Sequence, residues 1–343
     1  SRDLSPNRSR QKFLTIMVSL CSMLVSCLCS TSLSVESAVW TQLNNSGDTP
    51  TKRKAFGMVE LAEDTFIVFG GNDLTSFTSN IQKLEVSGTT STWTQIYSAI
   101  GADAPTARDH HTMTHFVDGF SAVFGGSDGT FRNDVWEMEV SGMYAVWNHL
   151  TNAGTIPSVR AGHTMTALSD NTGVMFGGYN YDNYLNDVFQ LQRSGDTATW
   201  MQLTDAGNPP SGRSVHAMTG LADGTFVIFG GYDGADYLSD IYQLEVSGTT
   251  ATWTMFSNVG DVPSNRNALG MVELGDGTVV VFGGNDGESS LNDVYQLQLS
   301  LPTTVEPTTV VSTTVVSTTA MPTDSPTTAV RTTAPTTAVP TTA

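Results

Sequence analysis

The chain has 343 residues, a formal net charge of −18 at pH 7 and only 14% charged side chains. Such a chain, with few clustered Lys and Arg residues, is unsuited to nucleic-acid binding, because phosphate contacts require basic groups. All three cysteines lie between Cys21 and Cys29, so the rest of the chain offers no disulfide, cysteine-ligated metal or cysteine nucleophile. The 32 glycines and the low charge are typical of an all-β protein with many turns.

The N-terminal segment has the features of a secretory leader. Arg2, Arg8, Arg10 and Lys12 precede an apolar run that ends at Cys29, and several serines follow it. A basic flank, a short apolar stretch and small residues are typical of a signal peptide. The run is also at the lower limit of a membrane span, so an uncleaved signal anchor is the alternative. We predict that residues 1–37 are a leader and that the protein is secreted or displayed at the cell surface.

The C-terminal segment differs abruptly in composition from the rest. Over residues 301–343, Thr, Pro, Val and Ala dominate and aromatic residues are absent. Such a sequence buries too little apolar surface to offset the entropy of ordering it. Thr-rich sequence with Pro is typical of an O-glycosylated stalk, and an unmodified linker is the alternative. We predict a disordered Thr/Pro-rich stalk, with membrane attachment only through an uncleaved leader or an anchor further along.

Residues 38–300 carry five copies of one unit. Each copy starts near a tryptophan, and the five are Trp40, Trp93, Trp147, Trp200 and Trp253. A loop with Pro and Arg follows, then a Met five residues after the Arg, then an apolar run that ends in Phe-Gly-Gly. The repeated arginines are Arg53, Arg108, Arg160, Arg213 and Arg266. A period of this length indicates a repeat architecture.

Each copy predicts four short strands. The first runs from the Arg through the Met, and the second is the apolar run before Gly-Gly, such as residues 225–229. That run is almost entirely apolar, so both of its faces are expected to be buried. The third is the Asp-Val-Tyr-Gln-Leu type of stretch, as at residues 293–297, and the fourth holds the Trp. One such unit cannot bury both faces alone, so the copies must stack side by side, as in a β-propeller.

The double glycine, the Tyr-containing strand and the Trp that follows it resemble the kelch-repeat family from residue 40 to about residue 299. The last copy lacks a Trp strand of its own, while the strand at Trp40 has no preceding strands. We therefore predict an all-β, five-bladed kelch-type β-propeller, closed by the strand at Trp40, which completes the last blade. Kelch propellers usually have six or seven blades, so five departs from the resemblance, and an incomplete ring is the alternative.

The predicted strand directions place the Pro–Arg loops and the loops after Gly-Gly on one face, which we call the variable-loop face. These loops differ between copies, whereas the turns on the opposite face are short and nearly repeated. Binding usually resides in loops on a rigid scaffold, and Tyr is a favoured contact residue. The predicted ligand contacts are Tyr179, Tyr181, Tyr184, Tyr232 and Tyr237.

The five repeated arginines are also candidate ligand contacts. If they start the innermost strands, they ring the mouth of the central channel and offer bidentate contacts to a carboxylate or sulfate. The resemblance implies the same, because arginines at similar positions line the pocket of kelch proteins that bind acidic peptides. The alternative is structural, with the arginines paired to aspartates after Gly-Gly. Those aspartates are Asp73, Asp128, Asp233 and Asp286.

Three histidines, His111, His163 and His216, share one repeat position and would suffice to hold a metal. Phe56 and Leu269 occupy the same position in the other copies, so we expect packing between blades and predict no metal. No nucleophile elbow, P-loop or dinucleotide motif occurs, and no catalytic residue or cofactor is predicted. The kelch-like copper radical oxidases need a Cys that the repeats lack.

These observations predict an exported, non-catalytic interaction module. It would bind a protein or glycan at the cell surface through the variable-loop face. One alternative is a secreted propeller enzyme acting on sugars, an isomerase or lyase that uses the arginine ring and a His. The other is a structural wall or matrix protein.

Overall fold

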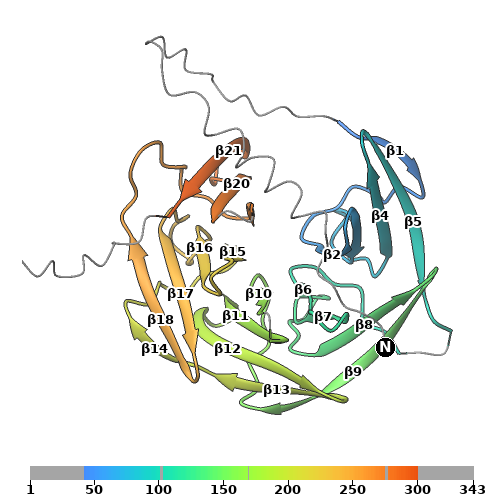
Figure 1. The fold of residues 1–343 in the computed structure, drawn as a ribbon, viewed down its shortest axis with the longest axis horizontal. Helices are drawn as coiled ribbons and strands as arrows, with labels where there is room; N and C mark the ends of the chain where they lie inside the picture. Colours follow the sequence, from blue (N-terminus) through green and yellow to red (C-terminus); the bar gives the residue numbers. More distant parts are fainter. Residues whose placement is uncertain (1–41, 101–102, 169, 275–276, 300–343) are drawn as a thin grey trace, which may run out of the picture. The chain divides into compact units, whose positions relative to one another are not determined.

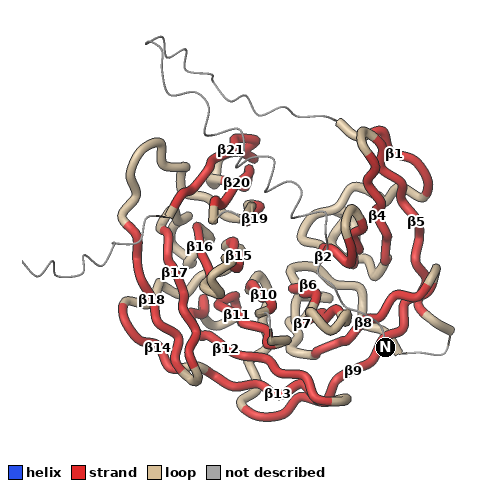
Figure 2. Tube along the Cα trace, in the orientation of Figure 1, coloured by secondary structure: helices blue, strands red, loops and turns tan. Residues whose placement is uncertain are grey.

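The computed structural model describes residues 42–100, 103–168, 170–274 and 277–299, and those up to Gln298 belong to one compact unit. The predicted leader, Trp40 and the predicted stalk lie outside the described residues. Every regular element of the described residues is a β-strand (Figures 1 and 2), which confirms the all-β prediction. Within the same ranges, no helix is long and apolar enough to cross a membrane.

Each repeat folds into a set of antiparallel strands, which we call a blade. The first blade consists of β2 (Gly57–Ala62), β3 (Thr65–Phe69), β4 (Ile81–Ser87) and β5 (Thr90–Ser98). The second consists of β6 (Thr112–His115), β7 (Ser121–Phe124), β8 (Val135–Ser141) and β9 (Tyr144–Gly154). The third consists of β10 (Thr164–Ala167), β11 (Thr172–Tyr179), β12 (Tyr184–Ser194) and β13 (Thr197–Gln202).

The fourth blade has the same order of strands, and the fifth has three strands in the described residues. The fourth consists of β15 (Ala217–Gly220), β16 (Phe226–Phe229), β17 (Ile241–Ser247) and β18 (Thr250–Phe256). The fifth consists of β19 (Gly270–Glu273), β20 (Thr278–Asn285) and β21 (Ser290–Gln298). The blades follow one another in chain order around a common centre, with β2, β6, β10, β15 and β19 innermost (Figure 2).

Parallel pairing links neighbouring blades at their outer strands. β1 (Asn44–Gly47) runs parallel to β5, and β14 (Thr204–Gly207) runs parallel to β18. The ends of β5 and β9 pair in the same way with β9 and β13. The tail of one outer strand therefore continues onto the next blade, and this pairing joins the first three blades into a single sheet.

The innermost strands begin later than the sequence analysis expected. The residue two positions after each repeated Arg has a positive φ: Ala55 54°, His110 50°, Gly162 68°, Val215 55° and Ala268 54°. A left-handed backbone cannot continue a strand, so the Arg precedes the strand instead of starting it. Backbone hydrogen bonds of 2.7–2.9 Å run along these five residues from one blade to the next. We call the five residues the collar.

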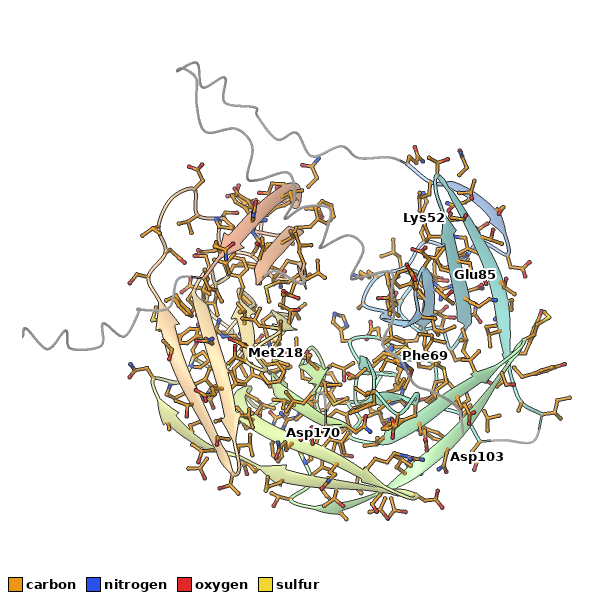
Figure 3. All side chains as sticks on the ribbon, in the orientation of Figure 1. Lys52, Phe69, Glu85, Asp103, Asp170 and Met218 are labelled. Carbon is orange, nitrogen blue, oxygen red and sulfur yellow. The ribbon has the colours of Figure 1, made fainter. Side chains whose placement is uncertain are left out.

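Phenylalanine, histidine and tryptophan side chains pack between neighbouring blades, and Figure 3 labels one of them, Phe69. Phe69 of the first blade lies 5.3 Å from His111 and 5.0 Å from Trp147 of the second, measured between ring centroids. Phe124 and Phe176 make the equivalent contacts with the His and Trp of the third and fourth blades. The expectation that the repeated His position is packed between blades is therefore confirmed.

The two ends of the series of blades expose apolar side chains that are buried elsewhere. Phe282 of the last blade is 43% exposed, whereas the equivalent Phe229 is 1% exposed. On the first blade, Phe56 and Met58 are 41% and 44% exposed. Closure of the ring by the strand at Trp40, and hence the number of blades in the complete ring, stays a prediction.

Candidate functional site

Four of the five repeated arginines are buried and saturated with hydrogen bonds. Arg108 Nη1 and Nη2 donate to the two carboxylate oxygens of Asp134 at 2.7 and 2.9 Å. The other donations go to Gly125 O from Nη1, to Thr106 Oγ1 from Nη2 and to Thr106 O from Nε. All five N–H groups of the guanidinium therefore have an acceptor. Arg160, Arg213 and Arg266 repeat this pattern with Asp187, Asp240 and Asp293.

The aspartates in these pairs are not the ones that the sequence analysis named. Asp134 and Asp240 directly precede the third strands of their blades, and Asp187 and Asp293 lie within theirs. Asp73, Asp233 and Asp286 instead accept hydrogen bonds within their own loops, and Asp128 pairs with Arg132. Hydrogen bonds from the Thr75 hydroxyl and from the backbone of Ser76 and Thr75 lower the pKa of Asp73 to about 2.

The backbone of each buried arginine joins two blades. Arg108 N donates to Thr78 O, and Arg108 O accepts from Gly71 N at 2.8 Å, both in the first blade. The side chain meanwhile holds the second blade through Gly125 and Asp134. The four buried arginines therefore fasten the loops, and the geometry gives no support to a ligand-binding role for Arg108, Arg160, Arg213 and Arg266. None of the five repeated arginines lines either of the two hollows at the centre of the blades.

Two hollows lie along the centre of the blades. The axial cavity, of about 920 Å³, is lined by residues of all five blades, including Met58, His111, His163, His216 and Met271. The funnel, of about 360 Å³, lies on the variable-loop face and is lined by Phe77, Phe131, Tyr179, Asp109 and neighbouring residues. The collar residues His110, Gly162 and Val215 line both hollows, so the collar separates the two.

The three histidines that line the axial cavity are buried. Burial, and then the positive charge of Arg108 and of Arg213, lower the pKa of His111 and of His216 to about 3. Burial also lowers the pKa of His163 well below its ordinary value. All three imidazoles are therefore neutral at physiological pH. Among the described residues, no three His, Cys, Asp or Glu side chains are grouped to hold a metal ion.

His110 and Asp109 form a polar pair in the funnel that the sequence analysis did not assign. His110 Nδ1 lies 3.0 Å from Asp109 Oδ1, and Asp109 is buried. The other blades place Ala, Gly or Val at the collar position of His110. The sequence did contain a signal for this pair, because His110 is an ionisable side chain at a repeat position that is otherwise small or apolar. The pair gives the funnel one side at which hydrogen bonds can orient a ligand.

The five predicted tyrosines contact one another in a continuous series that also includes Phe131. Phe131 stacks on Tyr181 with ring centroids 3.9 Å apart, and Tyr179 lies 5.9 Å from Phe131. The series continues through Tyr179–Tyr184, Tyr184–Tyr232 and Tyr232–Tyr237 at 4.7, 5.5 and 5.1 Å. We call Phe131, Tyr179, Tyr181, Tyr184, Tyr232 and Tyr237 the aromatic belt. It crosses loops of the second, third and fourth blades.

Hydrogen bonds hold the exposed end of the aromatic belt in place. The Phe131 backbone N–H donates to the Tyr181 hydroxyl at 2.6 Å, and the Tyr179 hydroxyl donates to Tyr181 O at 2.5 Å. Tyr181 is nevertheless 52% exposed. A rigid aromatic surface loses little conformational entropy on binding, which favours its use as a contact surface.

The sequence matches one family model and is similar to several known proteins. The sequence matches the KLHDC2/KLHL20/DRC7 Kelch-repeats domain over residues 26–224 and 123–311. It is 26% identical over 270 residues to acyl-CoA-binding domain-containing protein 5 of Arabidopsis thaliana, covering 76% of this chain and 40% of that protein. It is 27% identical over 283 residues to multiple epidermal growth factor-like domains protein 8 of Mus musculus, covering 77% and 10%. The chain therefore spans less than half the length of these relatives.

Proposed function

We propose, since the chain belongs to the kelch-repeat family, that it is a non-catalytic module that binds a protein partner on its variable-loop face. The observation that carries this proposal is the aromatic belt beside the funnel. Tyr179 and Phe131 belong to both features, so the belt continues into the hollow. A partner segment would lie along the belt and place one side chain in the funnel, against His110 and Asp109.

The charges around the aromatic belt favour a particular partner chemistry. Exposed carboxylates of Asp182 and Asp236 lie in the same loops as Tyr181 and Tyr237, and the whole chain carries a net charge of −18. Aromatic faces attract Lys and Arg side chains, and neighbouring carboxylates reinforce that attraction. We therefore propose a partner segment that combines aromatic or aliphatic side chains with Lys or Arg.

We propose a location for this binding from the composition of the two terminal segments. The predicted leader and the predicted Thr/Pro-rich stalk support a secreted or cell-surface location, with the stalk as a spacer. Both segments lie outside the described residues, so the location is proposed from the sequence alone. A protein partner at the cell surface would then meet the variable-loop face directly.

The exposed face of Tyr181 also favours a second candidate, a glycan ligand, because a flat aromatic ring packs well on a sugar ring. The enzyme alternative is less favoured by the geometry. It required an arginine ring beside a His, whereas the guanidinium groups of Arg108, Arg160, Arg213 and Arg266 are taken up by aspartates.

The proposal is tested by selecting ligands for the full chain from a random-peptide display library and, in parallel, from a glycan array. The variant is Tyr181→Ala, and the matched control is Tyr144→Ala, because Tyr144 is 55% exposed and follows a turn on the opposite face. We expect basic-aromatic peptides whose binding falls about 30-fold in Tyr181→Ala, as for a contact worth about 2 kcal/mol, and is unchanged in Tyr144→Ala. Equal binding by the two variants, or selection of glycans alone, would contradict the proposal.

A further inference from the structure

The first blade departs from the arginine–aspartate pairing that the other four blades share. Its repeated arginine is Arg53, but the repeat position of the paired aspartate holds Asn80 in this blade. The other blades have Asp134, Asp187, Asp240 and Asp293 at that position. The residue two positions further on is Gln82, where the other blades have Trp136, Phe189, Tyr242 and Tyr295. The first blade therefore lacks both the aspartate and the aromatic side chain that enclose the arginine in the other blades.

Arg53 keeps the loop contacts of its counterparts and lacks the carboxylate contacts. Nη1 donates to Gly70 O at 3.1 Å, Nε to Thr51 O at 3.2 Å and Nη2 to Thr51 Oγ1 at 3.3 Å. One further N–H on Nη1 and one on Nη2 have no acceptor among the described residues. In the other blades these two N–H groups bind the two oxygens of one aspartate. Arg53 therefore presents an open bidentate fork that matches the geometry of a carboxylate.

The fork belongs to a pocket that the missing side chains leave behind. A hollow of about 410 Å³ is lined by Arg53 and Asn80 together with Thr49, Gln82, Gln95, Tyr97 and neighbouring residues. In three other blades an aromatic ring covers the guanidinium, with its centroid 5.4–5.5 Å from the central carbon. In the first blade the Gln82 side-chain amide instead lies 2.7 Å from that of Gln95. The space beside the guanidinium is thus open in the first blade, whereas an aromatic ring fills it in those three blades.

Two carboxylates near the fork are already engaged with other donors. Asp73 Oδ1 accepts from the backbone N–H groups of Thr75 and Ser76 and from the Thr75 hydroxyl. Asp48, which lines the pocket, accepts from Gln95 N through Oδ2 at 3.2 Å. They reduce the positive potential of the pocket without occupying the fork, so a ligand would bind weakly and in a salt-dependent manner.

We propose that the Arg53 pocket binds a carboxylate group of a ligand, which takes the place of the aspartate that the first blade lacks. The carboxylate would accept one N–H from Nη1 and one from Nη2, as Asp134 does from Arg108. Its source is the C-terminus of a peptide, an acidic side chain or a sugar acid, which share this chemistry. The site is separate from the aromatic belt, and the inference does not rest on the proposed function.

The test is a nuclear magnetic resonance titration of the full chain at constant ionic strength. The three probes are N-acetylglycine for a peptide C-terminus, N-acetylaspartyl-N-methylamide for an acidic side chain, and methyl glucuronide for a sugar acid. N-acetylglycinamide is the uncharged control ligand. The variants are Arg53→Gln, which removes the fork, and Asn80→Asp, which fills it from within. Asn183→Asp is the matched control, because it adds the same charge in an exposed loop of the third blade.

We expect saturable shifts with at least one acid and none with N-acetylglycinamide. Binding should weaken at least tenfold in Arg53→Gln and in Asn80→Asp and should be unchanged in Asn183→Asp. Asn80→Asp should also raise the thermal midpoint, because it restores the pair found in four blades, and this second measurement shows that the variant is folded. The acid that binds most tightly identifies the source of the carboxylate. Absence of saturable binding by all three acids, or equal binding by Asn80→Asp, would overturn the proposal.

Discussion

In four blades the repeated arginine is structural, because its buried guanidinium has no N–H group left for a ligand. Arg160 is 0% exposed, and its carboxylate partner Asp187 holds the charge that burial would otherwise make unfavourable. Breaking a buried pair from one side is costly because it leaves the other charge desolvated and unpaired.

Asp187→Ala should therefore lower the free energy of unfolding by about 3 kcal/mol, as is typical when one partner of a buried pair is removed. Asp182→Ala is the control, because Asp182 is an exposed aspartate of the loop that precedes β12, the strand of Asp187. Surface substitutions usually change stability by less than about 0.5 kcal/mol. Urea denaturation followed by circular dichroism measures both variants. Equal stability of the two variants would show that the arginine does not depend on its aspartate.

The buried histidines predict how stability depends on pH. The pKa of His111 and of His216 is about 3 in the folded chain, against an ordinary value of 6.5. The unfolded chain then binds more protons between these values, so stability is complete above pH 6.5 and falls as the pH decreases toward 3. Each histidine should contribute a slope of about 1.4 kcal/mol per pH unit within that window.

His216→Phe tests this dependence, because Phe56 already occupies the same repeat position in the first blade. The variant should reduce the loss of stability between pH 6.5 and pH 4.5, measured by urea denaturation at each pH. This window lies above the ordinary pKa of the aspartates, so their titration contributes little. An unchanged slope would show that the histidine is protonated in the folded chain.

At the level of elements, the apolar runs before Gly-Gly predicted the second strands well, because burial on both faces leaves an unambiguous pattern. The predicted start of the innermost strand was wrong. The positive φ of the collar depends on backbone hydrogen bonds between blades rather than on residue type. Val215 shows this most clearly, since a β-branched residue rarely adopts a φ of 55°. β1 and β14 were not predicted either, because their polar residues pair only with a neighbouring blade.

The second glycine of each pair allows the close approach of two blades. Gly126 has a φ of 87°, and a Cβ there would lie 2.5 Å from Asp109 O and 2.7 Å from His111 Cβ. Gly126→Ala should lower the free energy of unfolding by more than about 2 kcal/mol, because it combines backbone strain with a steric clash.

Gly195→Ala is the control for this effect. Gly195 has a φ of 57°, but a Cβ there would meet nothing within 4 Å. It should cost only about 1 kcal/mol, the usual penalty for a left-handed backbone with a side chain. Thermal unfolding of both variants measures the difference, and equal losses would mean that the blades do not approach as closely as described.

At the level of the whole molecule, the sequence predicted the repeat unit and the sorting of loops onto two faces. The role of the tyrosines of the variable-loop face as ligand contacts stays a prediction. The sequence could not choose the partner of each arginine, because the paired residues lie 26 or 27 positions apart across two strands. It also left out Phe131, because contacts between loops of different blades depend on how the blades turn relative to one another. The Arg53 fork became visible only once the complete pairs of the other blades were known.

Ring closure is a separate prediction at this scale. In the fourth blade Thr254, just after the Trp, lies opposite Gln243. The same register in the last blade would place Thr41 opposite Gln296. The double substitution Thr41→Cys/Gln296→Cys should therefore form a disulfide under mild oxidation, detected by peptide mass spectrometry. Thr254→Cys/Gln243→Cys is the control pair; a disulfide in the control alone would rule out closure in this register.

The most direct test of the account is hydrogen–deuterium exchange of the full chain with and without a peptide selected from the display library. We expect protection at residues 127–134, 179–187 and 232–240, which carry the aromatic belt and the rim of the funnel. Protection in the turns at residues 87–90, 141–144, 194–197 and 247–250, with the variable loops unchanged, would place binding on the opposite face and contradict this expectation.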